Sequence, residues 1–167
     1  AVARTVQTLG VADVGLKWPN DVWWRERKLG GILLESGNDA GVFQVVAGIG
    51  LNVDLPPRIG DLIDQPWVDL REILEGAVVS RNRIAATLIN ELIAGFIRFE
   101  QEGFADLVEE WARFDVIAGR RVRLQMLNRA IIGIARGVNT TGALLLETAS
   151  GEIKPYVGGE ISLRVES

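Results

Sequence analysis

Lys28 stands next to the glycine pair Gly30 and Gly31, at the start of an apolar stretch. Glycine has no side chain, so a ligand can approach the backbone closely at such a position. A lysine ammonium beside it can neutralise a carboxylate or a phosphate as a compact point charge. The residues alone leave two interpretations open, an anion-binding site and a solvated hairpin with a bulge, and the hairpin is the simpler.

The run Lys17–Asp21 (KWPND) places Asn20 and Asp21 directly after a rigid proline turn. Loops that follow a strand often carry binding residues. The competing interpretation is an ordinary turn in which the Asn and Asp side chains bond to their own backbone. Residue chemistry by itself favours the ordinary turn.

Gly48–Asn52 (GIGLN) shares two glycines with a dinucleotide-binding fingerprint, but the third glycine and the following helix are missing. We expect instead a strand whose bare backbone forms the floor of a small-molecule pocket. The sequence also has no phosphate-binding P-loop motif. Trp67 ends a long loop over residues 54–67 and can stack on an adenine ring or simply anchor the loop.

Apolar periodicity predicts the elements that position these residues. Residues 1–9 read as the end of a helix that stops at Gly10, so the chain is expected to begin inside a domain. Strands are expected over residues 14–18, 22–24, 29–34 and 42–49, with a polar hairpin turn at 37–41. A short helix is expected over 70–74, a longer one after the N-cap Ser80, and another over 106–114. The longer helix has one apolar face, formed by Ile84, Leu88, Ile89, Leu92, Ile93, Phe96 and Ile97.

From Gly119 onward the apolar period changes from that of a helix to that of a strand. Strands are predicted over residues 122–126, 131–138, 143–148 and 161–165, with turn residues between them. Several short strands with regular turns indicate a small barrel or sandwich. We therefore expect two domains, residues 1–116 and 117–167.

Composition excludes several kinds of chemistry. The chain has 48% hydrophobic residues, no histidine and no cysteine, so a packed core is expected and imidazole bases, thiol nucleophiles and disulfides are excluded. The lack of cysteine fits a cytoplasmic protein. No apolar run approaches the ~20 residues of a membrane span, so no membrane partner is expected. Residues 115–167 have a net charge of only +2, which is too small to indicate nucleic-acid binding through this segment.

In order and at family-like spacing, these motifs resemble those of biotin–protein ligases. The resemblance rests on the KWPND run, on Arg27–Leu33 (RKLGGIL), on GIGLN and on Trp67. Two further segments match the bacterial members, Gly142–Glu147 (GALLLE) and Gly158–Arg164 (GGEISLR). It implies an α+β fold: a mixed β-sheet with packed helices, part of the class II synthetase-like biotin/lipoyl ligase fold, and then a small SH3-like β-barrel.

The resemblance also implies an activity, its cofactors and its partner. Biotin and ATP with Mg²⁺ would form biotinyl-AMP, and a lysine of a biotin carboxyl carrier domain would then take the biotinyl group. A homodimer through the strand edge near 29–34 is a further possibility. The protein itself is expected to hold no metal. The catalytic residues would be Lys28 and Asp21. Biotin would contact Lys28, Gly31, Ile32, Leu33, Gly48 and Gly50, and the nucleotide would contact Lys17, Asn20, Asn52, Trp67 and Arg164.

The sequence departs from the family pattern in what it lacks. The Arg/Gly-rich loop G-R-G-R-x-G and the Ser/Thr-rich strand that precede KWPND in the family are absent, so this chain alone is expected to be incomplete as an enzyme. Two alternatives therefore stay open: a non-catalytic module that binds a carrier domain, and a lipoate–protein ligase.

Overall fold

A computed structural model describes residues 1–60, 63, 65–126, 129–158 and 162–166. The chain divides into two compact units, one of residues 1–14 and 20–91, the other of residues 15–19 and 92–167. The division falls inside a long helix, whereas the domain boundary predicted at residue 116 lies after it. That boundary stays a prediction.

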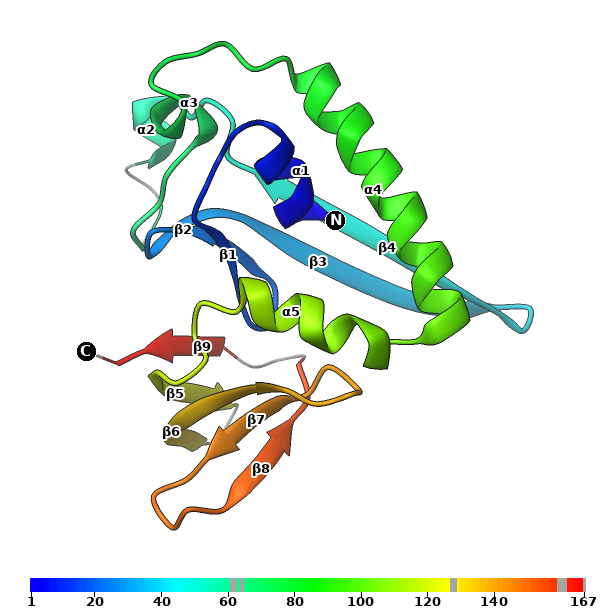
Figure 1. The fold of residues 1–167 in the computed structure, drawn as a ribbon, viewed down its shortest axis with the longest axis vertical. Coiled ribbons are helices and arrows are strands. Elements are labelled where there is room, and N and C mark those ends of the chain that lie inside the picture. The colour runs from blue at the N-terminus through cyan, green and yellow to red at the C-terminus, as the bar shows by residue number, and fades with distance from the viewer. Residues whose placement is uncertain (61–62, 64, 127–128, 159–161, 167) are drawn as a thin grey trace. The chain divides into compact units, whose positions relative to one another are not determined.

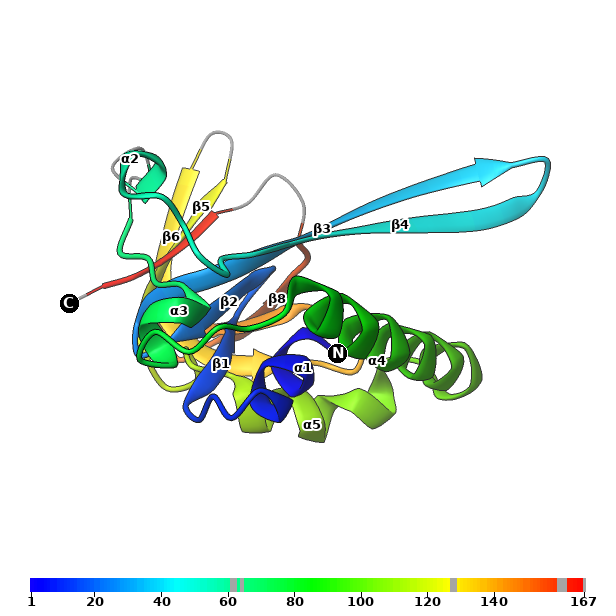
Figure 2. The same cartoon turned by 90° about the horizontal axis from the view of Figure 1, so that it is seen from above.

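The first sheet has four strands in the order β1-β2-β3-β4 (Figure 1). They are β1 (Val14–Lys17), β2 (Asp21–Trp24), β3 (Arg27–Asp39) and β4 (Val42–Leu51). β2 pairs with β3 and β3 with β4, both antiparallel. Because β3 and β4 are much longer than β2, they continue beyond it as a two-stranded ribbon, which Figure 2 shows from above.

The turn between β3 and β4 is shorter than predicted. The hairpin expected over residues 37–41 forms, but its predicted extent is wrong, because β3 continues to Asp39 and only Ala40 and Gly41 connect the strands. Both have positive φ angles, +49° and +85°. Positive φ at both central residues is the backbone that a two-residue hairpin needs.

The predicted helices form. α1 (Val2–Thr8) ends shortly before Gly10, whose φ of +90° suits a residue that follows a helix. α3 is Leu70–Ile73, α4 is Arg81–Glu102, and a 3₁₀ turn η1 (Ala105–Leu107) precedes α5 (Val108–Phe114). The N-cap of α4 is confirmed, since Ser80 Oγ accepts the Arg83 N–H at 3.4 Å. A short helix, α2 (Pro57–Gly60), lies inside the predicted loop.

The apolar face of α4 is buried only at its beginning. Ile84 is 5% exposed, but Ile89, Ile93, Phe96 and Ile97 are 50–55% exposed. The side chains have the expected helical spacing, yet the described residues do not cover them. The helical spacing of the apolar residues predicts that their side chains share one face of α4. It does not predict whether another segment packs on that face.

The second unit contains a five-stranded antiparallel sheet in the order β8-β7-β6-β5-β9. The strands are β5 (Arg121–Met126), β6 (Arg129–Val138), β7 (Leu144–Glu147), β8 (Ile153–Tyr156) and β9 (Ser162–Val165). Gly159, Glu160 and Ile161, which belong to a predicted motif, lie outside the described residues. β8 was not predicted, because Pro155 interrupts it. Proline is tolerated here, since β8 is an edge strand.

The barrel core follows from the alternation along its strands. Val122 and Leu124 are fully buried, while their neighbours Arg121 and Arg123 are exposed. The core also includes Trp18, Ile117, Ala135, Val138, Leu144, Leu146 and Leu163. Trp18 is 3% exposed, and its indole N–H donates to the Gly142 carbonyl at 3.1 Å. The tryptophan of the KWPND run is therefore a core residue of the second unit.

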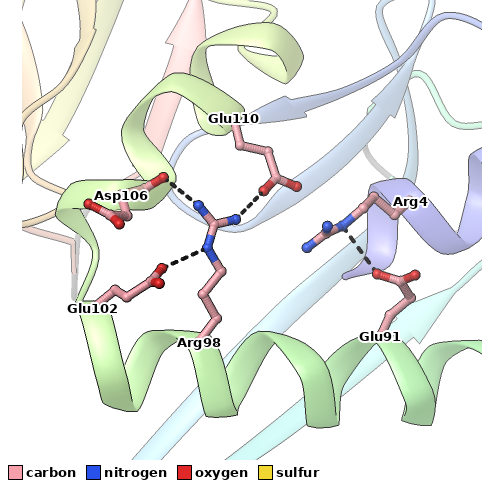
Figure 3. Close-up of polar contacts among 6 residues, drawn as sticks. All are labelled: Arg4, Glu91, Arg98, Glu102, Asp106 and Glu110. Atoms are coloured by element: carbon pink, nitrogen blue, oxygen red, sulfur yellow. Dashed lines mark hydrogen bonds and ion pairs between the residues drawn. The ribbon is translucent and has the colours of Figure 1, made fainter.

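Ion pairs bind the middle and the C-terminal part of α4, each to other residues of its own unit (Figure 3). In the first unit, Arg4 Nε lies 3.1 Å from Glu91 Oε2. In the second, Arg98 binds Glu102 and Glu110, each at 3.1 Å, and donates to the Asp106 carbonyl at 2.8 Å. The hydrogen bond that Arg98 donates to the Glu102 carboxylate raises the pKa of Arg98. None of the described helices is long and apolar enough to span a membrane.

Candidate functional site

Lys28 and Asp21 form an ion pair on one face of the first sheet. Lys28 Nζ lies 2.6 Å from Asp21 Oδ1, and the side chains are 28% and 10% exposed. Asp21 pairs with Gly31 in the β2–β3 ladder, so the carboxylate and this glycine share a face. Two residues that the sequence marked separately are thus brought together.

A β-bulge sets the position of Lys28. In the β2–β3 ladder Val22 pairs with Gly30, but the next residue, Trp23, pairs with Lys28. One extra residue, Leu29, is therefore accommodated in β3, and its side chain is fully buried. A bulge re-aims the side chains beside it. This explains how a lysine two residues before Gly30 reaches a carboxylate on β2.

The glycines next to the ion pair form an open floor. Gly31 pairs with Gly50, and Leu33 with Gly48, across β3 and β4. A Cβ atom added at Gly48 or Gly50 would meet nothing closer than 3.7 Å or 3.9 Å. The fold itself does not need glycine at these two positions, so their bare backbone leaves space for a ligand. Gly30 differs, because its Cβ would lie 2.4 Å from the Gly50 carbonyl oxygen.

The alternation of β3 separates two of the residues that were predicted to line the biotin pocket. Leu33 lies on the same face as Gly31 and is 60% exposed. Ile32 lies between them and points to the opposite face of the sheet. Its backbone N–H donates to the Asn20 carbonyl at 2.8 Å, which ties the KWPND turn to β3.

The backbone of Trp67 lies next to the backbone of Lys28 in a short parallel bridge. The Lys28 N–H donates to Pro66 O at 2.9 Å, and the Val68 N–H donates to Lys28 O at 3.0 Å, so residues 66–68 run parallel to the start of β3. The indole ring packs on Gly60, where a Cβ atom would lie 2.0 Å from Trp67 Cζ2. Trp67 also lines a cavity of about 530 Å³, together with Asp54, Leu55, Asp69, Arg71, Glu72, Glu75 and Gly76.

The remaining predicted nucleotide residues are placed differently. Asn52 directly follows β4, and its amide group donates to the carbonyls of Lys28 and Val68. Asn20 is exposed at its turn. Lys17 and Arg164 belong to the second unit. Lys17 is buried, and Arg164 lies on β9 opposite Arg123 of β5 in the strand ladder.

Two residues that support the site were not predicted. Asp69 is 7% exposed, and its carboxylate accepts the Leu55 N–H and the Glu72 N–H, each at 2.9 Å. It closes the loop and caps α3, and an Asp directly before a helix was a usable signal. Gly60 carried no comparable signal, because its contact with Trp67 exists only in the folded loop.

The described residues do not form a metal cage of their own. They contain no group of three or more Asp, Glu, His or Cys side chains that could hold a metal ion. Asp21 is the carboxylate that lies next to Lys28. Mg²⁺ is commonly held by one or two carboxylates together with substrate phosphates, so this donor set suits a metal that arrives with a nucleotide.

Two family models cover most of the chain. Residues 1–52 match the biotin/lipoate A/B protein ligase family, and residues 117–164 match the biotin protein ligase C-terminal domain. The fold and these matches define the class, a protein ligase of the biotin and lipoate group.

Individual relatives narrow the class. The chain is 43% identical to the bifunctional ligase/repressor BirA of Salmonella typhimurium over 98% of its own length and 50% of that protein. It is 34% identical to the biotin–[acetyl-CoA-carboxylase] ligase of Mycobacterium tuberculosis, over 92% of this chain and 54% of that one. A biotin protein ligase from Aquifex aeolicus, solved with biotin and ATP, superposes with a TM-score of 0.83 and 26% identity, covering 99% and 68% of the two chains.

The chain belongs to the biotin protein ligase family. The α+β fold that the resemblance implied is confirmed. The chain spans about half the length of the curated relatives it matches.

Proposed function

We propose that this chain provides the lysine-bearing part of a biotin–protein ligase, which forms biotinyl-AMP and transfers the biotinyl group to a lysine of a biotin carboxyl carrier domain. The Lys28–Asp21 ion pair above the Gly31, Gly48 and Gly50 floor is the observation that carries the proposal. It combines a cation suited to a carboxylate with a backbone surface that a ligand can approach closely.

The residues on this face have separate tasks in the proposed reaction. Lys28 holds the biotin carboxylate against the α-phosphate and stabilises the negative charge that builds up there. Asp21 keeps the ammonium in place and positions the incoming lysine or the metal-bound phosphates. Trp67 packs against the adenine ring. Mg²⁺, when bound with ATP, neutralises phosphate charge. Lys17 and Arg164 stay predictions as nucleotide contacts.

Calorimetric titration of biotin into the 167-residue chain, with and without ATP, tests this proposal. Saturable binding that is lost in Lys28→Ala and kept in Lys154→Ala supports it. Lys154 is a matched control, because it is a half-exposed lysine on β8, paired with Glu152 at 3.0 Å. Equal biotin affinity in the chain and in Lys28→Ala would remove Lys28 from the site.

A second candidate stays open from the sequence analysis, a non-catalytic module that binds a carrier domain. Binding of a carrier domain without any biotin-dependent exchange between ATP and pyrophosphate would favour this module. The name of the first family model also includes lipoate. Competition between biotin and lipoate for adenylation distinguishes the two acids.

A second copy of the chain is a further proposed partner. The pairing of β2 with β3 ends at Gly31, so the outer edge of β3 from Leu33 onward has no β2 partner among the described residues. An open strand edge can pair with another strand. Light scattering after size exclusion measures the oligomeric state. Cytoplasmic location and the absence of nucleic-acid binding through this segment stay predictions.

A further inference from the structure

Three backbone segments meet at Asn52. They are the start of β3 at Lys28, Asn52 directly after β4, and residues 66–70, which run from the end of the loop to the first residue of α3. Asn52 Nδ2 donates to Lys28 O at 3.3 Å and to Val68 O at 3.1 Å. One side-chain amide therefore uses both of its protons to join β3 to the segment that contains Trp67.

The main chain of Asn52 continues the same cross-link. Its N–H donates to Leu29 O and its carbonyl accepts the Leu70 N–H, each at 2.9 Å. Leu29, Val68 and Leu70 are fully buried, so these bonds are shielded from water. A buried carbonyl that loses its donor is costly to the fold.

This cross-link joins the segments that contain Lys28 and Trp67, the two residues proposed to contact the ligands. The Lys28 side chain turns to Asp21 and the glycine floor, whereas Trp67 lies between Pro66 and Val68 with its ring on Gly60. A change in the spacing between Lys28 O and Val68 O would move the ammonium and the indole relative to each other.

We propose that Asn52 is a positioning residue that holds Lys28 and Trp67 in register, so that the carboxylate site and the nucleotide site are presented together. The identity of the ligands at these two sites rests on the proposed function. The role of Asn52 in holding Lys28 and Trp67 in register does not depend on it. The carboxamide is specific for this task, because it supplies two donors from one nitrogen. A carboxylate at this position would face two carbonyl oxygens with no proton to offer either.

Amide hydrogen exchange of the ligand-free chain, resolved by residue with NMR, measures the register directly. In Asn52→Asp we expect the Lys28 and Val68 amides to exchange about ten-fold faster or more, because each donates within the segment pair that Asn52 joins. The amides of Val122 and Leu124 in the barrel are expected to keep their rates. Unchanged rates at Lys28 and Val68 would overturn the proposal.

The matched control is Asn139→Asp. Asn139 Oδ1 accepts the Thr141 N–H and the Ala143 N–H at 3.0 Å and 2.9 Å, an acceptor role that a carboxylate keeps. This variant is expected to leave the Lys28 and Val68 amides unchanged. A measurement on the unmodified chain is independent of whether Asn52→Asp folds: the Asn52 side-chain amide protons should exchange at least ten-fold more slowly than those of exposed Asn82. Equal rates would contradict the paired hydrogen bonds.

Titrations then separate positioning from direct contact. If Asn52 sets the register, Asn52→Asp weakens biotin and ATP together, and Asn52→Gln, which keeps both amide protons on a longer chain, recovers part of both. A loss confined to ATP would show a nucleotide contact alone and would overturn the coupling. If the unmodified chain bound neither ligand, the proposed function would fail while the exchange result on the register still stood.

Discussion

The Lys28 ammonium lies 2.6 Å from the Asp21 carboxylate, and this pair joins β2 to β3 above the pairing of Asp21 with Gly31. In the chain without ligands, the cation proposed to hold a substrate carboxylate is thus held by a carboxylate of the protein. The positioned cation and the bare glycines beside it are the basis of the predictions that follow.

The first prediction concerns the strength of this ion pair. In a double-mutant cycle with Lys28→Met and Asp21→Asn, we expect a coupling free energy of about 1 kcal/mol in the free energy of unfolding, since the pair is partly shielded from water. Urea unfolding of the four proteins measures it. Additivity within roughly 0.3 kcal/mol would mean that the pair contributes nothing to the fold.

The glycine floor gives a second prediction. Gly48→Ala and Gly50→Ala are expected to change the free energy of unfolding by less than about 1 kcal/mol, because an added Cβ meets nothing within 3.7 Å. Both should nevertheless weaken biotin binding at least several-fold, since the methyl group occupies the ligand's space. Gly30→Ala is the contrasting variant, because its Cβ would lie 2.4 Å from a backbone oxygen and should destabilise the fold. Unaltered biotin affinity in the Gly48 and Gly50 variants would place the ligand elsewhere.

The contact between Gly60 and Trp67 gives a third prediction. In Gly60→Ala the new Cβ would lie 2.0 Å from Trp67 Cζ2, so the ring must move, at a cost of about 1–3 kcal/mol in stability. ATP affinity should fall more than biotin affinity, as isothermal titration can show. Gly95→Ala in α4 is the control. It meets nothing within 4 Å and should stabilise the helix by roughly 0.5–1 kcal/mol.

Much of this fold could be predicted from the sequence, because strand alternation and helix caps are local signals. The barrel strands follow the alternation at Val122 and Leu124, and Ser80 marks the start of α4. β8 was missed because Pro155 argues against a strand unless that strand is known to lie at an edge. The turn predicted at 37–41 was too long, because polar residues on an exposed ribbon have the composition of a loop.

The individual residues of the site could be predicted from the sequence. The contacts that join them could not. Motif resemblance pointed to Lys28, Asp21 and Asn52. The bulge that turns Lys28 toward Asp21 and the paired hydrogen bonds of Asn52 depend on ladder register between distant segments. Neither amino-acid type nor local spacing carries that information. The strand predicted over 29–34 already implied that Ile32 points away from Gly31, although the resemblance placed both residues against biotin.

The half-exposed face of α4 leads to a fourth prediction. Ile84→Ala should lower the stability of this chain by about 2–4 kcal/mol, because Ile84 is 5% exposed. Phe96→Ala should cost only roughly 1 kcal/mol or less, since half of that ring is already in contact with water. Denaturant unfolding of both variants gives the comparison. An equal or larger loss for Phe96→Ala would show that another segment or a second copy covers this face.

The last prediction concerns pH and Asp115, which lies between α5 and the barrel. Its Oδ1 accepts the Ile117 N–H at 2.9 Å and the Ala118 N–H at 3.2 Å, but burial raises the pKa of Asp115 above its ordinary value of 3.8. The folded chain therefore binds this proton more tightly than the unfolded chain. Its stabilising contribution is complete below pH 3.8 and is lost as the pH rises through the pKa of the folded state.

Asp115→Asn removes this titration while its carbonyl oxygen still accepts both backbone N–H groups. The free energy of unfolding of the variant, relative to the unmodified chain, should therefore increase as the pH rises above 3.8 and then level off. Urea unfolding at a series of pH values measures the difference, in which the contributions of other carboxylates cancel. A flat difference for Asp115→Asn would show that burial does not penalise this carboxylate. A difference of the opposite sign would mean that the two N–H groups stabilise its charge more than burial destabilises it.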